Sequence, residues 1–320
     1  MKRQGAQIKT RQEVIAGADI ILSIHAPTPS EIDQLSTKVL IGVYQPLMHV
    51  DAMKNWAAKN ITSFSLDMLP RTTRAQAMDV LSSQANIAGY KAVLTAANLY
   101  SRYFPMFMTA AGSIKPAKLL ILGAGVAGLQ AIATAKRLGA VVEVFDTRPA
   151  VKEEVMSLGA KFVEVEGAAD ASKAGGYAVE QDEAFQQRQK QRIAESIAKA
   201  DIVITTAQIP GKKAPQLITK EMLESMRAGS VVIDLAAASG GNTALTVNNS
   251  TVVHNGVTII GNSNLPSTMS SDASKLYGKN LLNFLNLVID KENNINLNWE
   301  DDLVAGCCIT HGGEIKNERV

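Results

Sequence analysis

The sequence predicts an α/β protein with two domains, each a doubly wound parallel sheet, joined by long helices. Two observations support this fold class. Short apolar, β-branched runs alternate with helical patterns through the second half of the chain, which is typical of βαβ units. The chain also has 320 residues, a length that favours two domains over one. The strands predicted in this half are 119–122, 141–146, 161–165, 201–206, 230–235 and 257–261, and the helices between the first five are 126–138, 149–158, 184–199 and 217–227.

The beginning of the chain and its end predict further elements. A helical pattern runs from about Thr73 to Phe104, because apolar and small residues recur there at spacings of three and four. Its many alanines and Gly89 suit close packing against another element. The remaining predictions are strands at 19–24, 38–43 and 61–66 and helices at 47–59 and 270–290.

The bulk composition excludes several classes of protein. Apolar residues make up 46% and charged residues 19%, which is ordinary for a globular core. The 32 basic and 30 acidic residues leave a net charge of +2, far from the excess typical of nucleic-acid binding. Neither a run of 18 apolar residues nor a signal peptide is present. The two cysteines, Cys307 and Cys308, are adjacent and suit a reducing compartment, so a soluble intracellular protein is expected.

A glycine motif follows the first strand of the second domain. Gly123, Gly125 and Gly128 form a G-x-G-x-x-G pattern between that strand and a helix, which is the context of a Rossmann dinucleotide turn. The first glycine permits the turn, the second lets the backbone approach a pyrophosphate, and the third lets the helix lie against the strand. The N–H groups around Val126 would face the phosphates. We therefore expect a dinucleotide-binding domain at 83–268 and an N-terminal-type α/β domain at 1–82 plus 269–320.

The residue that ends the second strand indicates which dinucleotide is bound. Asp146 can accept hydrogen bonds from a ribose hydroxyl and would repel a 2′-phosphate, which favours NAD over NADP. Arg148 leaves this preference open, since a nearby arginine can accommodate a phosphate. Plain structural interpretations remain: a strand–helix turn for the glycines and a solvated strand end for Asp146.

The segment 70–84, PRTTRAQAMDVLSSQ, is unusually dense in polar side chains. Thr73 and Gln76 are spaced as a capping box, and Asp79 could complement the helix dipole. Helix-start chemistry explains about half of these polar residues. Gln76, Asp79 and Ser82 recur every third residue and would share a helical face, with Arg71 in reach. We expect this polar cluster to face the cleft between domains, where a nicotinamide would lie.

The remaining residues offer no acid–base, nucleophilic or metal chemistry, so any reaction would belong to a cofactor. The cysteines are expected to be buried and structural, and the histidines to be surface or packing residues without metal spacing. Segment 167–191 is polar and Gly-rich, and is either functional or disordered. The histidines are His25, His49, His254 and His311.

These motifs together resemble a known family. PRTTRAQAMDVLSSQANIAGYKAV, LLILGAGVAGLQAIATAKRLGAVVEVFDTRPA, TTAQIPGKKAPQLIT and GSVVIDLAAASGGN are similar to the NAD(H)-binding component of proton-translocating NAD(P) transhydrogenase. The resemblance runs from about residue 17 to about 312, and the nearest related family is alanine dehydrogenase.

The resemblance implies a function and its site. Hydride would pass from NADH on this component to NADP(H) on a separate component, in the Re/Si-specific reaction that a membrane-spanning component couples to proton movement. A homodimer is expected, itself soluble and peripheral at the cytoplasmic side of the inner membrane. The residues expected to carry the reaction are Arg71, Gln76, Asp79 and Ser82. Those expected to bind the cofactor are Arg71, Thr72, Thr73, Arg74 and Gln76 at the nicotinamide and its ribose, Gly123, Gly125, Val126 and Gly128 at the pyrophosphate, Asp146, Thr147 and Arg148 at the adenosine ribose, and Gly176 and Tyr177 in a mobile loop; no metal is expected.

The chain differs from the family pattern at its start, where about fifty residues of the usual first domain are not matched. Two alternatives therefore stay open. One is alanine dehydrogenase activity, although Ser23 and Tyr44 stand where that family has the lysine and histidine of its keto-acid pocket. The other is a truncated NAD-binding subunit without turnover.

Overall fold

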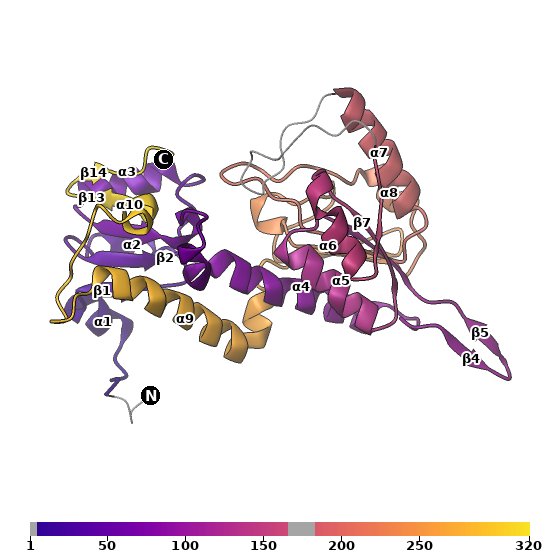
Figure 1. The fold of residues 1–320 in the computed structure, drawn as a ribbon, viewed down its shortest axis with the longest axis horizontal. Coiled ribbons are helices and arrows are strands. Elements are labelled where there is room, and N and C mark those ends of the chain that lie inside the picture. Colours follow the sequence, from indigo (N-terminus) through magenta and orange to yellow (C-terminus); the bar gives the residue numbers. More distant parts are fainter. Residues whose placement is uncertain (1–4, 166–182) are drawn as a thin grey trace. The chain divides into compact units, whose positions relative to one another are not determined.

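The computed structural model describes residues 5–165 and 183–320 (Figure 1). The chain divides into two compact units, Met1–Leu81 with Ser274–Val320, and Ser82–Ala273. Two helices contain residues of both units, α4 (Val80–Leu99) and α9 (Ser270–Val288). Within the described residues, no helix has the length and apolar character needed to cross a membrane.

The first unit is built on a five-stranded sheet in the order β1-β2-β3-β13-β14. Strands β1 (Ile20–Leu22), β2 (Val39–Gly42) and β3 (Thr62–Ser65) run parallel, and β13 (Cys308–His311) and β14 (Glu314–Ile315) add an antiparallel edge. Its other helices are α1 (Arg11–Gly17), α2 (Pro29–Ile32), α3 (Val50–Ala58) and α10 (Asp302–Cys307). Phe64 of β3 is fully buried and packs on Phe284 of α9, with ring centroids 5.5 Å apart.

The second unit has a seven-stranded sheet in the order β11-β12-β10-β9-β6-β7-β8. All neighbouring strands are parallel except β11, which is antiparallel to β12. Reading from β8, the parallel strands follow the order 3-2-1-4-5-6 of a dinucleotide-binding sheet, and the order reverses between β6 and β9. The bounds are β6 (Lys118–Leu122), β7 (Val141–Phe145), β8 (Lys161–Phe162), β9 (Ile202–Thr205), β10 (Val231–Asp234), β11 (Thr251–His254) and β12 (Val257–Ile260).

Helices cover both faces of this sheet, so the predicted α/β, doubly wound class is confirmed. Leu119 and Ile121 of β6 belong to the core that includes residues of α4 and α5 (Val126–Arg137). Leu120 and Leu122 belong to the core on the opposite face, with residues of α7 (Glu183–Ile197) and α8 (Lys220–Glu224). The short helix α6 (Lys152–Ser157) follows β7. The small residues predicted for close packing do so, since a Cβ on Gly89 of α4 would lie 2.1 Å from the carbonyl oxygen of Ala127 in α5.

Several elements differ from the sequence prediction. The helix expected from Thr73 to Phe104 begins at Val80 and ends at Leu99, and is followed by a hairpin of β4 (Phe107–Thr109) and β5 (Gly112–Ile114). Figure 1 shows this hairpin as a narrow arm that extends away from the sheet of its own unit. Strands β11, β13 and β14 and helices α1, α2 and α10 were not predicted either.

Candidate functional site

The turn between β6 and α5 uses its three glycines in different ways. Gly123 has a φ of +107°, which L side chains rarely adopt, and a Cβ there would lie 2.4 Å from Thr206 Oγ1. A Cβ on Gly128 would lie 1.9 Å from the carbonyl oxygen of Gly123. A Cβ on Gly125, in contrast, would meet none of the described residues within 4 Å. Two glycines therefore shape the turn, and the third leaves its backbone open to an incoming group.

Helix α5 begins at this opening. Gly125 is its N-cap and offers no side chain to the N–H groups of the first turn, and within this described helix that turn contains no acidic residue. Val126 is the first helical residue and is 40% exposed. The first-turn N–H groups and the helix dipole carry a partial positive charge, which suits a phosphate. This end of α5 fits the pyrophosphate role expected from the sequence.

The carboxylate of Asp146 connects this turn to the end of β7. Its Oδ2 accepts hydrogen bonds from the backbone N–H of Ala124 at 2.7 Å and from Arg148 Nη2 at 2.8 Å. Its Oδ1 accepts from the backbone N–H of Arg148 at 2.8 Å and from Arg148 Nε at 2.9 Å. These donors leave the Asp146 side chain only 5% exposed, and the pairing raises the pKa of Arg148. Sequence reasoning placed Asp146 at the strand end and missed its internal partners.

A buried polar network holds the loops that follow β9 and β10. Asp234 is fully buried, and its Oδ2 accepts from the backbone N–H of Asn242 at 2.6 Å and from Thr246 Oγ1 at 2.6 Å. The Asn242 side chain accepts from the N–H of Ala207 at 3.0 Å and donates to the carbonyls of Ala207 and Pro215, each at 2.8 Å. Because β9 adjoins β6 at the reversal of strand order, this network shapes the edge where a dinucleotide binds.

Thr206 joins the glycine turn to β9. Its backbone N–H donates to the carbonyl of Leu122 at 2.9 Å, and its hydroxyl donates to the carbonyl of Gly123 at 3.1 Å. Sequence reasoning did not select Thr206, Asp234 or Asn242. Their signal was available, since each follows or ends a predicted strand at the same edge as Gly123.

The polar segment 70–84 starts differently from the predicted helix. Thr73 has helical backbone angles (φ −58°, ψ −36°) and makes no side-chain cap; Thr72 Oγ1 instead accepts from the N–H of Ala75 at 3.3 Å. An N-cap needs extended backbone, so the predicted capping box of Thr73 and Gln76 is wrong. A 3₁₀ helix spans Arg74–Met78, and the chain turns at Asp79 (ψ +89°) before α4.

This turn separates the polar residues that were expected to share one helical face. Gln76 lies in the 3₁₀ helix, Asp79 at its end, and Ser82 in the first turn of α4. Arg71, Thr72, Thr73, Arg74 and Gln76 are exposed, whereas Asp79 and Ser82 are half-buried. The one-face expectation is therefore wrong, because a five-residue 3₁₀ helix and a turn replace the first turns of the predicted α-helix.

Arg74 is held within the first unit by two aspartates. Its Nη1 donates to Asp301 Oδ2 at 2.6 Å, its Nη2 donates to Asp301 Oδ1 at 2.7 Å, and it also pairs with Asp302. The guanidinium lowers the pKa of Asp301 to about 2, and Asp301 also caps α10 through the N–H of Leu303 at 2.9 Å. In this structure Arg74 therefore fixes segment 70–84 to α10, an arrangement that sequence spacing did not indicate.

Ser23 and Tyr44 fill the place where the resemblance expected the keto-acid pocket of alanine dehydrogenase. Their hydroxyls lie 3.0 Å apart, Tyr44 is 2% exposed, and its ring packs edge-on against Trp56 at 5.1 Å. The Tyr277 hydroxyl donates to the carbonyl of Ser23 at 2.6 Å. Burial raises the pKa of Tyr44 well above its ordinary value. None of these four described side chains is a cation that would hold a carboxylate.

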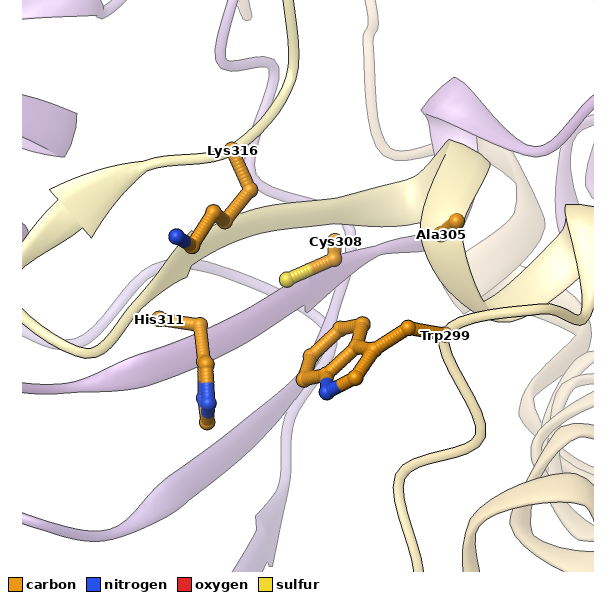
Figure 2. A pocket seen from close by; sticks show the side chains of 5 residues that line it. All are labelled: Trp299, Ala305, Cys308, His311 and Lys316. Carbon is orange, nitrogen blue, oxygen red and sulfur yellow. The ribbon is translucent and has the colours of Figure 1, made fainter.

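Other groups in the described residues offer less chemistry. A cavity of about 320 Å³ is lined by Trp299, Ala305, Cys308, His311 and Lys316 (Figure 2). Burial raises the pKa of the Cys308 thiol to about 12, so it stays protonated, and Cys307 is also buried. No group of three or more histidine, cysteine or acidic residues in the described segments could hold a metal ion. Gly176 and Tyr177, predicted in the mobile loop, lie outside the described residues.

The strand order, the glycine turn and the acidic strand end together define a dinucleotide-binding protein of the doubly wound class. Two family models match it: "Alanine dehydrogenase/PNT, N-terminal domain" over residues 2–88 and "Alanine dehydrogenase/PNT, C-terminal domain" over residues 92–318. A chain of the NAD(P) transhydrogenase subunit alpha from Rhodospirillum rubrum is 46% identical over 322 residues, which cover 97% of this chain and 84% of that protein.

Solved structures agree with this assignment. The crystal structure of transhydrogenase from Sinorhizobium meliloti matches with a TM-score of 0.87 at 46% identity, covering 98% of this chain and 85% of that one. An L-alanine dehydrogenase shares the fold, with a TM-score of 0.76 at 21% identity over 99% of this chain and 83% of that one. The chain therefore belongs to the alanine dehydrogenase/PNT family and, within it, to the alpha subunits of NAD(P) transhydrogenase.

Proposed function

We propose that this chain binds NAD(H) and passes hydride from NADH to NADP⁺ held on a partner component of the transhydrogenase. The observation that carries the proposal is the glycine turn at the reversal of strand order. Its Gly125 backbone is open to an incoming group, and the carboxylate of Asp146 is fixed to the same turn through the Ala124 N–H. The donors at the start of α5 suit a pyrophosphate, and the acidic group suits a ribose hydroxyl.

The proposed reaction makes few chemical demands on the chain itself. The bound cofactor supplies the hydride, and the transfer between two nicotinamide rings needs position and dryness rather than proton transfer. The chain would contribute orientation. Arg71, Gln76, Asp79 and Ser82 are proposed to hold the nicotinamide carboxamide and ribose. Thr72, Thr73, Thr147 and the segment with Gly176 and Tyr177 are proposed as further cofactor contacts.

Partners complete the proposed activity. An NADP(H)-binding component would accept the hydride, and a membrane-spanning component would couple the transfer to proton movement. We propose a homodimer that associates with this complex at the cytoplasmic side of the membrane. The Rhodospirillum rubrum relative is named as one piece of a subunit alpha, which supports a protein assembled from several chains.

Two measurements test the proposal. Titration of the full chain with NADH, followed by quenching of NADH fluorescence, should show saturable binding. Mixing the chain with an NADP(H)-binding component should then give hydride transfer from NADH to NADP⁺. Saturable binding without transfer would support a subunit that lacks turnover, and no saturable binding would refute the proposal.

Alanine dehydrogenase activity is the competing function. In that family a lysine and a histidine bind the keto acid and transfer a proton, and this chain has Ser23 and Tyr44 there, with their hydroxyls bonded to each other. We expect no oxidation of NADH that depends on pyruvate and ammonium. Such activity would overturn the transhydrogenase assignment of the site.

A further inference from the structure

Arg148 covers the carboxylate that the proposed function assigns to the adenosine ribose. It donates to Asp146 from its backbone N–H, its Nε and its Nη2, at 2.8, 2.9 and 2.8 Å. A further hydrogen bond comes from the N–H of Ala124 at 2.7 Å. The Arg148 side chain is itself only 18% exposed, so this pair is largely removed from water.

This arrangement limits what can reach Asp146. Each carboxylate oxygen has about two strong acceptor positions, and both oxygens already accept two hydrogen bonds. A ribose hydroxyl can therefore bond to Asp146 only by replacing a donor. The Ala124 N–H and the Arg148 N–H are fixed by the backbone, so the guanidinium is the donor that can move.

A 2′-phosphate would meet the same pair differently. It would place negative charge beside Asp146, which costs free energy, while a guanidinium is the side chain best shaped to bind a phosphate. In this chain the guanidinium is held by Asp146 and is withheld from a phosphate. Removing the charge of Asp146 would end the repulsion and release the guanidinium in one step.

We propose that Arg148 is a latent 2′-phosphate-binding residue, and that Asp146 selects NAD(H) both by repelling the phosphate and by holding the Arg148 guanidinium. The inference rests on the proposed function, since it takes the end of β7 as the adenosine-ribose site. It makes Arg148 a specificity-determining residue rather than a second ribose ligand.

The test compares four forms of the full chain: the unmodified protein, Asp146→Asn, Asp146→Asn with Arg148→Gln, and Asp146→Asn with Lys152→Gln. The introduced asparagine can still accept from the Ala124 N–H. The Lys152 change is the matched control, because it removes one positive charge four residues from Arg148, on a lysine that pairs with Glu164. The probes are adenosine 2′,5′-bisphosphate and NADPH, with 5′-AMP and NADH for comparison.

We expect Asp146→Asn to bind adenosine 2′,5′-bisphosphate about tenfold or more tightly than the unmodified chain. Adding Arg148→Gln should abolish this gain, and adding Lys152→Gln should leave most of it. The proposal is overturned if Asp146→Asn shows no gain, or if the two second changes reduce binding equally. Far-UV circular dichroism checks folding; should Asp146→Asn not fold, Asp146→Ser replaces it in all three variants.

The design separates this inference from the proposed function. Failure of the unmodified chain to bind NADH would refute the proposed function. Normal NADH binding with no Arg148-dependent gain for the bisphosphate would refute the inference alone. Hydride transfer is not needed for either result.

Discussion

A Cβ atom on Gly128 would lie 1.9 Å from the carbonyl oxygen of Gly123, whereas a Cβ on Gly125 would meet none of the described residues within 4 Å. The first approach is between two backbone segments that cannot both stay in place. We therefore expect Gly128→Ala to lower the free energy of unfolding by about 2 kcal/mol or more. Gly125→Ala should change it by less than about 0.5 kcal/mol, since φ is −78° and the space is empty.

The two variants should separate again in cofactor binding. The new methyl group of Gly125→Ala fills the approach to the turn, so NADH affinity should fall by on the order of tenfold or more. Urea unfolding and NADH fluorescence titration measure the two effects. A Gly125→Ala chain that binds NADH normally would remove the main argument for a pyrophosphate at this turn.

Asn242 is the connection between the loops after β9 and β10. Its side chain makes three hydrogen bonds to the backbone of Ala207 and Pro215, and these groups would be left without partners in Asn242→Ala. We expect a loss of about 3 kcal/mol in the free energy of unfolding and faster hydrogen exchange at the Ala207 N–H. Gln208→Ala is the control, because that exposed side chain donates one hydrogen bond, to the carbonyl of Leu235. Equal losses in the two variants would contradict the connecting role.

The ion pair of Arg74 and Asp301 predicts a dependence of stability on acid. The folded pKa of Asp301 is about 2, below its ordinary value of 3.8, because Arg74 stabilises the charged form. A lowered folded pKa contributes stability above the unfolded pKa, and the contribution is lost as pH falls from about 4 to about 2. Since Arg74 is about half exposed, solvent screening limits the contribution to about 1 kcal/mol.

Asp301→Asn isolates this contribution, because asparagine can still cap α10. Urea unfolding should show the variant less stable than the unmodified chain at about pH 6 and equally stable near pH 2. A difference that stays constant across this range would mean that the cap, and not the ion pair, causes the loss.

The parts of the fold that the sequence revealed are those whose residues report their surroundings locally. Strands such as β6 and β10 are buried on both faces, so they are continuous apolar runs bounded by polar residues. Strand β4 is exposed throughout and β11 is half exposed, so neither shows a burial pattern. Strand β13 pairs with β3, whose residues lie about 245 positions earlier, and no local pattern specifies such a partner.

The candidate site divides in the same way. The glycine turn and Asp146 follow from a local motif, because chain geometry alone dictates where those residues lie. The donors that a side chain finally meets do not follow from spacing. Arg148 could have pointed at a ligand instead of Asp146, and Arg74 meets an aspartate 227 residues away. The capping prediction at Thr73 was wrong for a related reason, since a 3₁₀ helix and an α-helix begin with similar residues.

Arg71 and Gln76 provide the most direct test of the proposed nicotinamide contacts. Both side chains are exposed in the structure, so replacing them should disturb the fold little. If they orient the ring rather than supply affinity, Arg71→Ala and Gln76→Ala should slow single-turnover hydride transfer by about 10-fold to 100-fold while NADH affinity changes by less than about threefold. Lys54→Ala is the control, because it removes a comparably exposed positive charge from α3 of the same unit. Stopped-flow mixing with an NADP(H)-binding component gives the rate, and fluorescence titration gives the affinity. An unchanged rate, or a fall in rate matched by an equal fall in affinity, would show that these residues do not position the nicotinamide.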